Sequence, residues 1–141
     1  MNAMRDARNP VFRYRVYWED TDAGGVVYHA RYLHFMERAR SDWLTALGIS
    51  QPELRAEHGL LFAVTHVEID FRKPARLEDE LEVSVRVQQL GRVRMDFVKE
   101  IVRDGLCLVT ASVRAACLDA KRFAPARLPT PIAERIRAGA R

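Results

Sequence analysis

Alternating and helically spaced apolar residues divide the chain into strands and helices. Residues 11–18, VFRYRVYW, are β-branched and aromatic with polar residues between them, which predicts a first strand. Over residues 29–48 apolar side chains recur every three or four positions, which predicts an amphipathic helix of about 18 residues that stops at Gly48. Its apolar positions are Tyr32, Phe35, Met36, Ala39, Trp43 and Leu47.

A shorter helix and four more strands follow this long helix. Ser50-Gln51-Pro52-Glu53 matches a capping box with proline just inside the helix, which predicts a second helix that ends at His58. From Gly59 the apolar pattern has a period of two, and the predicted strands are 61–72, 79–90, 92–103 and 106–118. Their short connections require antiparallel pairing, and the helix needs a sheet to cover its apolar stripe. We therefore predict one α+β domain over residues 1–141, with a five-stranded antiparallel sheet wrapped around the long helix.

The composition fits one soluble globular domain, with 48% hydrophobic and 30% charged residues. The chain has no apolar run near the roughly 18 residues of a membrane span, and its start, MNAMRDARNP, lacks the apolar stretch of a signal peptide. We therefore expect a cytoplasmic protein.

The net charge of +4 is unevenly distributed along the chain. Residues 1–15 and 121–141 carry net charges of +3 and +5, and the segment between them carries −4. This is not the even basic face of a nucleic-acid-binding protein, so no nucleic-acid partner is predicted. The basic ends would suit a phosphorylated ligand or an acidic membrane surface.

The two cysteines predict neither a disulfide nor a metal site. Cys107 and Cys117 lie in one predicted strand, about 33 Å apart at 3.3 Å per residue, whereas a disulfide tolerates about 7 Å between Cα atoms. Neither cysteine has a close Cys or His partner that could complete a zinc site.

The segment between the first strand and the long helix holds the candidate chemistry. Within residues 17–32, YWEDTDAGGVVYHARY, three acids precede two glycines, which let the backbone approach a ligand closely. Backbone N–H groups at the start of a helix lack internal partners and can hold an oxyanion. Taken alone, the motif is better explained by a helix cap and a turn than by a functional site. A calcium loop is excluded because Val26, Val27 and Tyr28 occupy the ligand positions after the glycines.

Residues 16–40, VYWEDTDAGGVVYHARYLHFMERAR, resemble the signature of the 4-hydroxybenzoyl-CoA thioesterase family. Within that family they are most similar to the Tol-Pal-associated acyl-CoA thioesterases, the YbgC group. The likeness continues through FRKPARLEDELEV at 71–83 and covers nearly all of the domain core, residues 12–132. It implies a hotdog fold, an acyl-CoA substrate, no cofactor, and homodimers or homotetramers with sites between subunits.

The resemblance also assigns roles to residues of the loop. The family's catalytic aspartate falls on Asp22, and the backbone N–H that polarises the thioester carbonyl falls on His29. Two roles of the His29 side chain stay equally open. Its imidazole acts in catalysis or positions water, or it only caps the helix while the backbone N–H is engaged. Trp18 stands where relatives often have tyrosine. The substrate-binding positions implied are Gly25, Val27, Tyr28 and Tyr32, the last at the border of the acyl pocket.

Other polar residues have simpler explanations beside functional ones. Arg92 and Arg94 are candidates for the CoA phosphates, helped by the basic tail from Lys121, although exposed strand charges need no ligand. Glu19 and Asp20 are interpreted as solvated or capping acids. The remaining histidines, at 34, 58 and 66, lack partners at metal-ligand spacing.

Thioester hydrolysis leaves the role of Asp22 open between nucleophile and general base. One rival function is an acyl-thioester hydratase or dehydratase on the same fold. Another is a non-catalytic protein that gathers acyl carrier protein or envelope machinery at the inner membrane. The sequence does not define the length or aromaticity of the acyl group.

Overall fold

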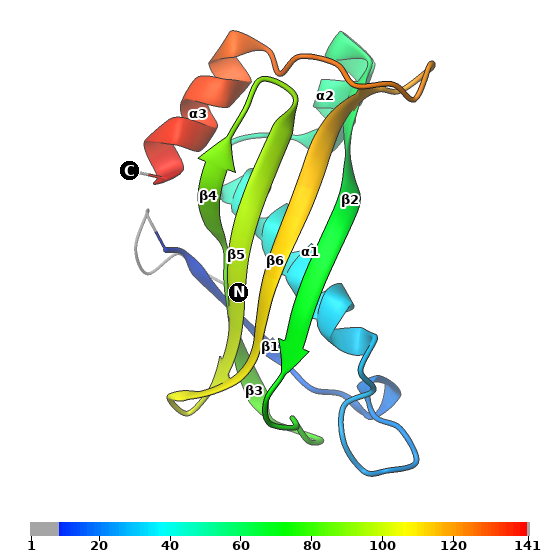
Figure 1. Ribbon diagram of the computed structural model, residues 1–141, viewed down its shortest axis with the longest axis vertical. Helices are drawn as coiled ribbons and strands as arrows, with labels where there is room; N and C mark the ends of the chain where they lie inside the picture. The colour runs from blue at the N-terminus through cyan, green and yellow to red at the C-terminus, as the bar shows by residue number, and fades with distance from the viewer. Residues whose placement is uncertain (1–8, 141) are drawn as a thin grey trace.

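The computed structural model describes residues 9–140, and one antiparallel sheet packs on a long helix (Figure 1). Residues 1–8 and residue 141 lie outside the described residues, and with them part of the basic N-terminal segment 1–15 and of the start MNAMRDARNP. In chain order the strands are β1 (Val11–Arg15), β2 (Leu60–Phe71), β3 (Glu80–Ser84), β4 (Arg86–Leu90), β5 (Arg94–Arg103) and β6 (Leu106–Asp119). The helices are the 3₁₀ turn η1 (Trp18–Asp20), α1 (Arg31–Ala46), α2 (Gln51–His58) and α3 (Thr130–Ala140).

The sheet has the strand order β1-β3-β5-β6-β2. β4 follows β3 along the same edge of β5, so that β3 pairs with the end of β5 and β4 with its first half. All pairings are antiparallel, and the hairpin connections confirm the predicted α+β class. The sheet has six strands rather than the predicted five, because the expected strand 79–90 breaks at Val85. The N–H of Val85 donates to the carbonyl of Pro10 at 2.9 Å, so Val85 belongs to neither β3 nor β4.

The long helix α1 contributes the apolar stripe that the sequence predicts. Phe35, Met36, Ala39 and Trp43 are buried beneath the sheet, and Trp43 meets Phe97 of β5 edge to face at 5.5 Å between ring centroids. The sheet covers this face of α1 in Figure 1, with the inward residues of β3 and β5 completing the core. This packing fixes the start of α1 relative to the sheet.

The boundaries of the elements differ from the prediction mainly where tertiary contacts intervene. α1 begins at Arg31 instead of His29, because residues 28–30 form a turn in which the N–H of Arg31 donates to the carbonyl of Tyr28 at 2.8 Å. β5 begins at Arg94 instead of Arg92, whose carbonyl accepts a hydrogen bond from Leu128 at 2.9 Å. The second helix is capped by the hydroxyl of Ser50, as predicted.

The carboxyl-terminal helix α3 was not predicted, since residues 121–141 were interpreted as a basic tail. Its signals are Pro131 in the first turn and the spacing of Ile132, Ala133 and Ile136. Ala133 and Ile136 are buried, so α3 packs against the body of the protein. Of the helices that the structure describes, none is long and apolar enough to cross a membrane.

Candidate active site

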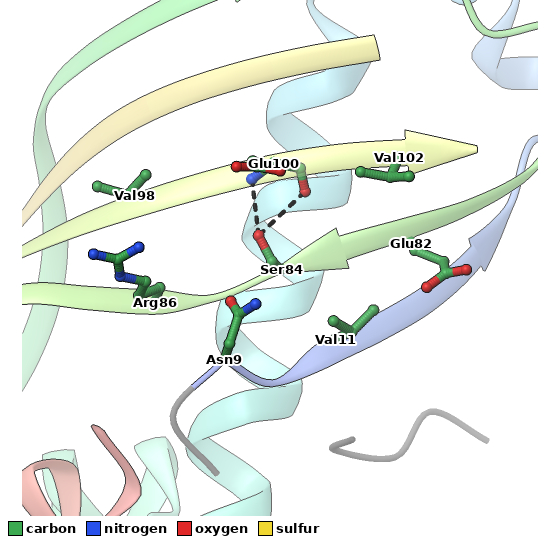
Figure 2. A pocket seen from close by; sticks show the side chains of 8 residues that line it. All are labelled: Asn9, Val11, Glu82, Ser84, Arg86, Val98, Glu100 and Val102. Atoms are coloured by element: carbon green, nitrogen blue, oxygen red, sulfur yellow. Dashed lines mark hydrogen bonds between the residues drawn. The ribbon is translucent and has the colours of Figure 1, made fainter. Parts of the chain in front are cut away.

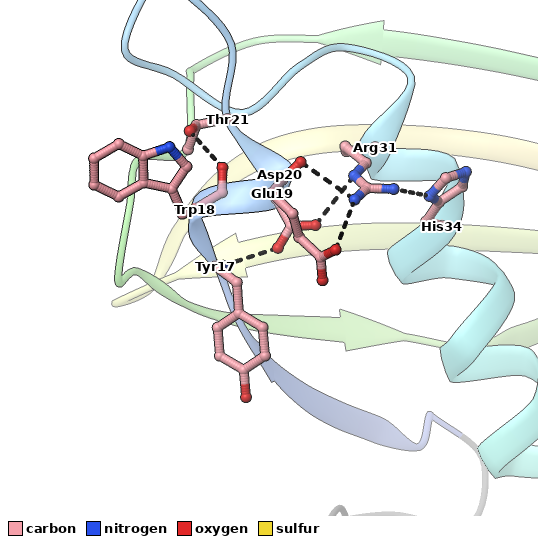
Figure 3. Close-up of polar contacts among 7 residues, drawn as sticks. All are labelled: Tyr17, Trp18, Glu19, Asp20, Thr21, Arg31 and His34. Carbon is pink, nitrogen blue, oxygen red and sulfur yellow. Dashed lines mark hydrogen bonds and ion pairs between the residues drawn. The ribbon is translucent and has the colours of Figure 1, made fainter.

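The loop from η1 to α1 is anchored by Asp20, a residue that is only 2% exposed. Its Oδ2 accepts the backbone N–H of Tyr17 at 2.8 Å, and its Oδ1 lies 3.2 Å from Nε of Arg31 (Figure 3). Its backbone carbonyl also accepts the N–H of Tyr28 at 2.9 Å. Asp20 is therefore a capping acid as predicted, but it is buried and paired rather than solvated.

Arg31 connects this loop to the first turn of α1. Besides Asp20, its guanidinium lies 3.6 Å from the carboxylate of Glu19 and donates to the carbonyl of Glu19 at 3.2 Å (Figure 3). Nη1 of Arg31 also contacts Nδ1 of His34 at 2.8 Å. These contacts hold both ends of the loop at the start of α1.

Asp22 is exposed, and its two carboxylate oxygens differ in their surroundings. Oδ1 accepts the N–H of Gly24 at 2.8 Å, and the backbone around it closes through Asp22 N to Val26 O and Gly25 N to Asp22 O, both at 3.0 Å. Oδ2 makes no hydrogen bond within residues 9–140. One oxygen of this exposed residue is therefore held in place by the turn, while the other has no partner among the described residues.

The two glycines serve different needs of this turn. Gly25 has a φ of +78°, a left-handed conformation that favours glycine, although a Cβ there would meet no neighbouring atom. A Cβ at Gly24 would lie 3.1 Å from Oδ1 of Asp22. Glycine at position 24 therefore lets the backbone approach the carboxylate, and glycine at 25 closes the turn.

His29 lies in the turn just before α1 and offers a free backbone donor. Its N–H makes no hydrogen bond to any residue that the structure describes. Its exposed imidazole packs on Tyr28 at 4.5 Å and edge to face on Phe71 at 6.3 Å between ring centroids. The site thus combines an unpaired N–H with an aromatic surface.

Tyr28, His29, Tyr32 and Phe71 form an aromatic patch next to the loop. Tyr28 is 45% and Phe71 51% exposed, whereas the ring of Tyr32 is buried and lies 5.6 Å from that of Phe71. The hydroxyl of Tyr32 accepts the N–H of Ala75 at 3.0 Å. Sequence reasoning missed Phe71, which was assigned to a strand without a role in the site.

Tyr32 also lies within electrostatic range of the candidate carboxylate. Burial is the main cause that raises the pKa of Tyr32, the hydrogen bond from Ala75 opposes it, and the negative charge of Asp22 adds a smaller rise. Val27 is nearby but buried, and its N–H donates to the carbonyl of Ala75 at 2.8 Å. The side chain of Val27 thus belongs to the core in this chain, while Asp22, Gly25, Tyr28, His29 and Tyr32 gather at one site.

Arg92 and Arg94 lie at the other end of the sheet from Asp22. Figure 1 shows the β4–β5 turn beside α3, with the loop before α1 at the opposite end of the molecule. Arg94 is 3.7 Å from Asp96, whereas Arg92 lines a cavity of about 220 Å³ together with Arg127 and Arg137. Within one chain the structure does not bring these arginines to Asp22.

A separate cavity of about 170 Å³ opens on the face of the sheet away from α1 (Figure 2). It is lined by outward-facing residues of β1, β3, β4 and β5, among them Ser84, whose hydroxyl accepts the N–H of Glu100 at 2.9 Å. Because the sheet lies between this cavity and the helix, it forms no part of the Asp22 site. No group of three His, Cys, Asp or Glu side chains suited to a metal ion occurs within residues 9–140.

Comparison with known proteins agrees with this fold. The family model of the thioesterase-like superfamily matches residues 16–136. The acyl-CoA thioesterase YbgC of Haemophilus influenzae is 43% identical over 86% of this chain and 89% of its own. The acyl-CoA thioester hydrolase YbgC of Escherichia coli O6:H1 is 40% identical over 84% of this chain and 88% of its own.

The crystal structure of a probable thioesterase from Bartonella henselae superposes with a TM-score of 0.82. It shares 40% sequence identity and covers 86% of this chain and 99% of its own. The sheet wrapped around α1 is therefore the hotdog fold of the thioesterases, as the motif at 16–40 predicts. On the family model and these relatives, the chain belongs to the thioesterase-like superfamily, in its YbgC-like group.

Proposed function

We propose that this protein hydrolyses an acyl-CoA thioester to a free acid and CoA, with Asp22 as the catalytic carboxylate. The observation that carries the proposal is the arrangement of Asp22, with Oδ1 fixed by Gly24 and Oδ2 exposed and free of partners. A structural cap has no need of an exposed second oxygen. The relatives named acyl-CoA thioesterases support the choice of substrate class.

The thioester carbonyl would be polarised by the backbone N–H of His29. This N–H is unpaired and stands just before α1, where the helix dipole favours negative charge. A carbonyl oxygen bound there gains stabilisation as it becomes an oxyanion. The imidazole of His29 is held by Tyr28 and Phe71, which suits a role in lining the site as well as one in positioning water.

Two mechanisms use the same carboxylate. In the first, Oδ2 attacks the carbonyl carbon, CoA leaves as its thiolate, and water then hydrolyses the mixed anhydride on Asp22. In the second, the carboxylate accepts a proton from a water that attacks the carbonyl directly. Both consume one water and release acid and CoA, and incorporation of ¹⁸O from water into Asp22 during a single turnover would identify the first.

The acyl group would pass over Gly25 and the aromatic patch, with Tyr28 and Tyr32 at its edge. Gly25 is exposed and carries no side chain to obstruct the approach of a ligand. Val27 would act by fixing the backbone of the loop through Ala75 rather than by touching the substrate. Val27, predicted as a substrate-binding residue, would thus affect binding only indirectly.

The phosphates of CoA would bind at the cavity formed by Arg92, Arg127 and Arg137. Three guanidiniums without an acidic partner among the described residues suit a phosphorylated ligand better than the paired Arg94 does. β5 alone spans about 30 Å between this cavity and the Asp22 end, at 3.3 Å per residue. A CoA that reached both would therefore contact two subunits.

A homodimer through β2 would bring these two ends together. β2 is a terminal strand that pairs only with β6 among the described strands, so its other edge can accept a second copy. Antiparallel pairing about a twofold axis would set the Asp22 end of one subunit beside the Arg92 end of the other. Association into tetramers, and contacts with acyl carrier protein or an inner-membrane envelope partner, stay predictions.

The proposal is tested by following thiol release from short, long and aromatic acyl-CoAs. Hydrolysis releases a free thiol at a rate that matches acid formation, whereas a hydratase or dehydratase would change the absorbance of a conjugated double bond without releasing thiol. Absence of thiol release from the whole panel by the correctly folded protein would exclude the proposed activity.

A further inference from the structure

A crevice of about 260 Å³ runs between α1 and β2, beyond the residues assigned to the reaction. Its walls are mostly apolar and come from α1, β2 and β6: Leu33, Met36, Val64, Val67 and Val113. Its polar residues are His34, Glu37, Arg40 and Lys99. Two cationic side chains in an otherwise apolar crevice call for an explanation, because burying a charge costs free energy unless it is paired.

Arg40 has an unused hydrogen-bond donor in this crevice. Only 5% of the residue is exposed, and its Nη2 donates to Oε1 of Glu37 at 2.8 Å. Its Nη1 is buried without a hydrogen-bond partner in the described part of the chain. Buried donors in folded proteins nearly always find an acceptor, so an unpaired guanidinium nitrogen indicates a missing ligand.

Lys99 of β5 adds a second buried cation close to Arg40. It is 1% exposed, its Nζ donates to the carbonyl of Met36 at 3.0 Å, and it lies 5.3 Å from the ring centroid of Phe97. An ammonium group has three donors, and this is the one hydrogen bond that it makes with the described residues. Burial lowers the pKa of Lys99 to about 7, with a further lowering from Arg40 that Glu37 opposes.

The charges in the crevice do not balance within this chain. Glu37 is the one acid that lines it, and the side chain of Glu37 is 56% exposed, so much of its charge is solvated. His34 is engaged with Arg31 at 2.8 Å. Arg40 and Lys99 form the floor of the crevice, and their unused donors have no anionic acceptor among the described residues.

The crevice begins next to the candidate active site. Leu33 is in the first turn of α1, near the free N–H of His29, and Arg40 lies about 14 Å along the helix from Arg31 at 1.5 Å per residue. An acyl group whose carbonyl binds at His29 would therefore follow α1 along apolar walls toward two cations. The walls suit methylene groups, and the floor suits a negative charge.

We infer that this crevice binds the acyl group and that Arg40 and Lys99 select acyl chains that end in a carboxylate. The inference rests on the proposed thioesterase function and names its substrate class: the CoA monothioesters of dicarboxylic acids. A distal carboxylate would accept from Nη1 of Arg40 and from Nζ of Lys99, and would balance the charge of the floor. A chain ending in a methyl group would leave both donors unpaired.

The test compares acyl-CoAs that differ at the far end of the chain alone. Octanoyl-CoA is paired with suberoyl-CoA, and dodecanoyl-CoA with dodecanedioyl-CoA, so that the far carboxylate can reach Arg40, and kcat/KM is measured for each. We expect the wild-type protein to prefer a dicarboxylic member by about ten- to a hundredfold, the range of a hydrogen bond to a charged group. In Arg40→Met and Lys99→Met this preference should fall toward unity, with activity on the methyl-terminated partner retained.

Arg38→Met is the matched control, because Arg38 is an exposed arginine on the same helix outside the crevice. It should keep the wild-type preference. Circular dichroism establishes that each variant is folded, and the two crevice variants serve as independent tests if one fails to fold. Light scattering follows the mass of each variant.

Equal hydrolysis of the paired substrates by the wild type would overturn this inference and leave the thioesterase proposal standing. Hydrolysis of no substrate in either series would overturn both. A change of mass in Arg40→Met with unaltered selectivity would also overturn the inference, because the crevice would then be covered by a second copy of the chain.

Discussion

Oδ1 of the buried Asp20 lies 3.2 Å from Nε of the partly exposed Arg31, whereas Asp22, two residues further on, is exposed. The two aspartates of one short motif thus have opposite surroundings. Asp20 is used by the fold, through Tyr17 and Arg31, while Asp22 keeps one oxygen free. Substitution by asparagine at each position separates the two roles.

Asp20→Asn is expected to destabilise the protein by about 2 kcal/mol. Breaking a buried ion pair costs about 3–5 kcal/mol, and here asparagine keeps a hydrogen bond and Arg31 is partly exposed, which lowers the cost. The free energy of unfolding is measured by urea denaturation of wild type, Asp20→Asn and Asp22→Asn. Equal stability of wild type and Asp20→Asn would show that the pair does not anchor the loop.

The loop motif illustrates how much of the site the sequence predicts. Local patterns suffice for the start of α1 to within two residues. Asp22 as the candidate carboxylate comes instead from the resemblance of residues 16–40 to the thioesterase signature, and it stays a prediction. Local patterns do not distinguish Asp20 from Asp22 by burial, because burial of Asp20 depends on Tyr17 and Arg31 folding around it. Both residues are simply acids before a helix in the sequence.

Long-range contacts explain the other differences between prediction and structure. The break at Val85 depends on the carbonyl of Pro10, which lies 75 positions earlier, and no local pattern encodes it. The burial of Lys99 follows from its place opposite Met36 of α1, although alternation along β5 does put it on the inner face. α3, in contrast, had local signals in Pro131 and the apolar spacing after it.

The stability of the protein should rise with pH between about 7 and 10 because of Lys99. Burial lowers its pKa in the folded state to about 7, whereas an unfolded lysine titrates near 10.4. In that window the unfolded state binds more protons, so the free energy of unfolding increases with pH, by at most about 1.4 kcal/mol per pH unit. Below pH 7 both states are protonated and the destabilisation is fully present.

Lys99→Met should abolish this pH dependence and stabilise the protein near neutral pH. The charged and titratable groups that line the crevice with Lys99 are Arg40, Glu37 and His34 of α1; β2 and β6 contribute valines. Subtracting the unfolding curve of the variant from that of the wild type at each pH cancels the titration of distant groups. A difference that stays constant from pH 7 to 10 would contradict a lowered pKa.

Arg92→Glu is expected to raise the KM for acyl-CoA with a smaller effect on kcat. The substitution places a negative charge beside Arg127 and Arg137, where the CoA phosphates are proposed to bind. Because exposed charges are screened by salt, the increase in KM should shrink from low to high ionic strength. Arg94→Glu provides the comparison, and a KM unchanged by both substitutions at every salt concentration would remove the arginines from the binding site.

The active protein is expected to be at least a dimer, held in part by the free edge of β2. Thr65 is an exposed residue of β2 near the β-bulge between Val64 and His66, and it does not line the crevice. Thr65→Pro removes a backbone donor from this strand and should shift the mass toward that of one chain. Active wild-type protein with a mass of about 16.2 kDa by light scattering would rule out an obligate dimer.

Asp22→Asn gives the sharpest test of the proposed chemistry. Asparagine keeps the size of the side chain and can still accept the N–H of Gly24, but it lacks the negative charge and the nucleophilic, basic oxygen. Loss of a positioned carboxylate should lower kcat by about 10²–10⁴ with little change in KM. Stability should fall by about 1 kcal/mol at most, since asparagine caps a turn nearly as well as aspartate. Thiol release is measured for both proteins at matched folded concentration with several acyl-CoAs, and near wild-type turnover in the variant would show that Asp22 is a structural cap.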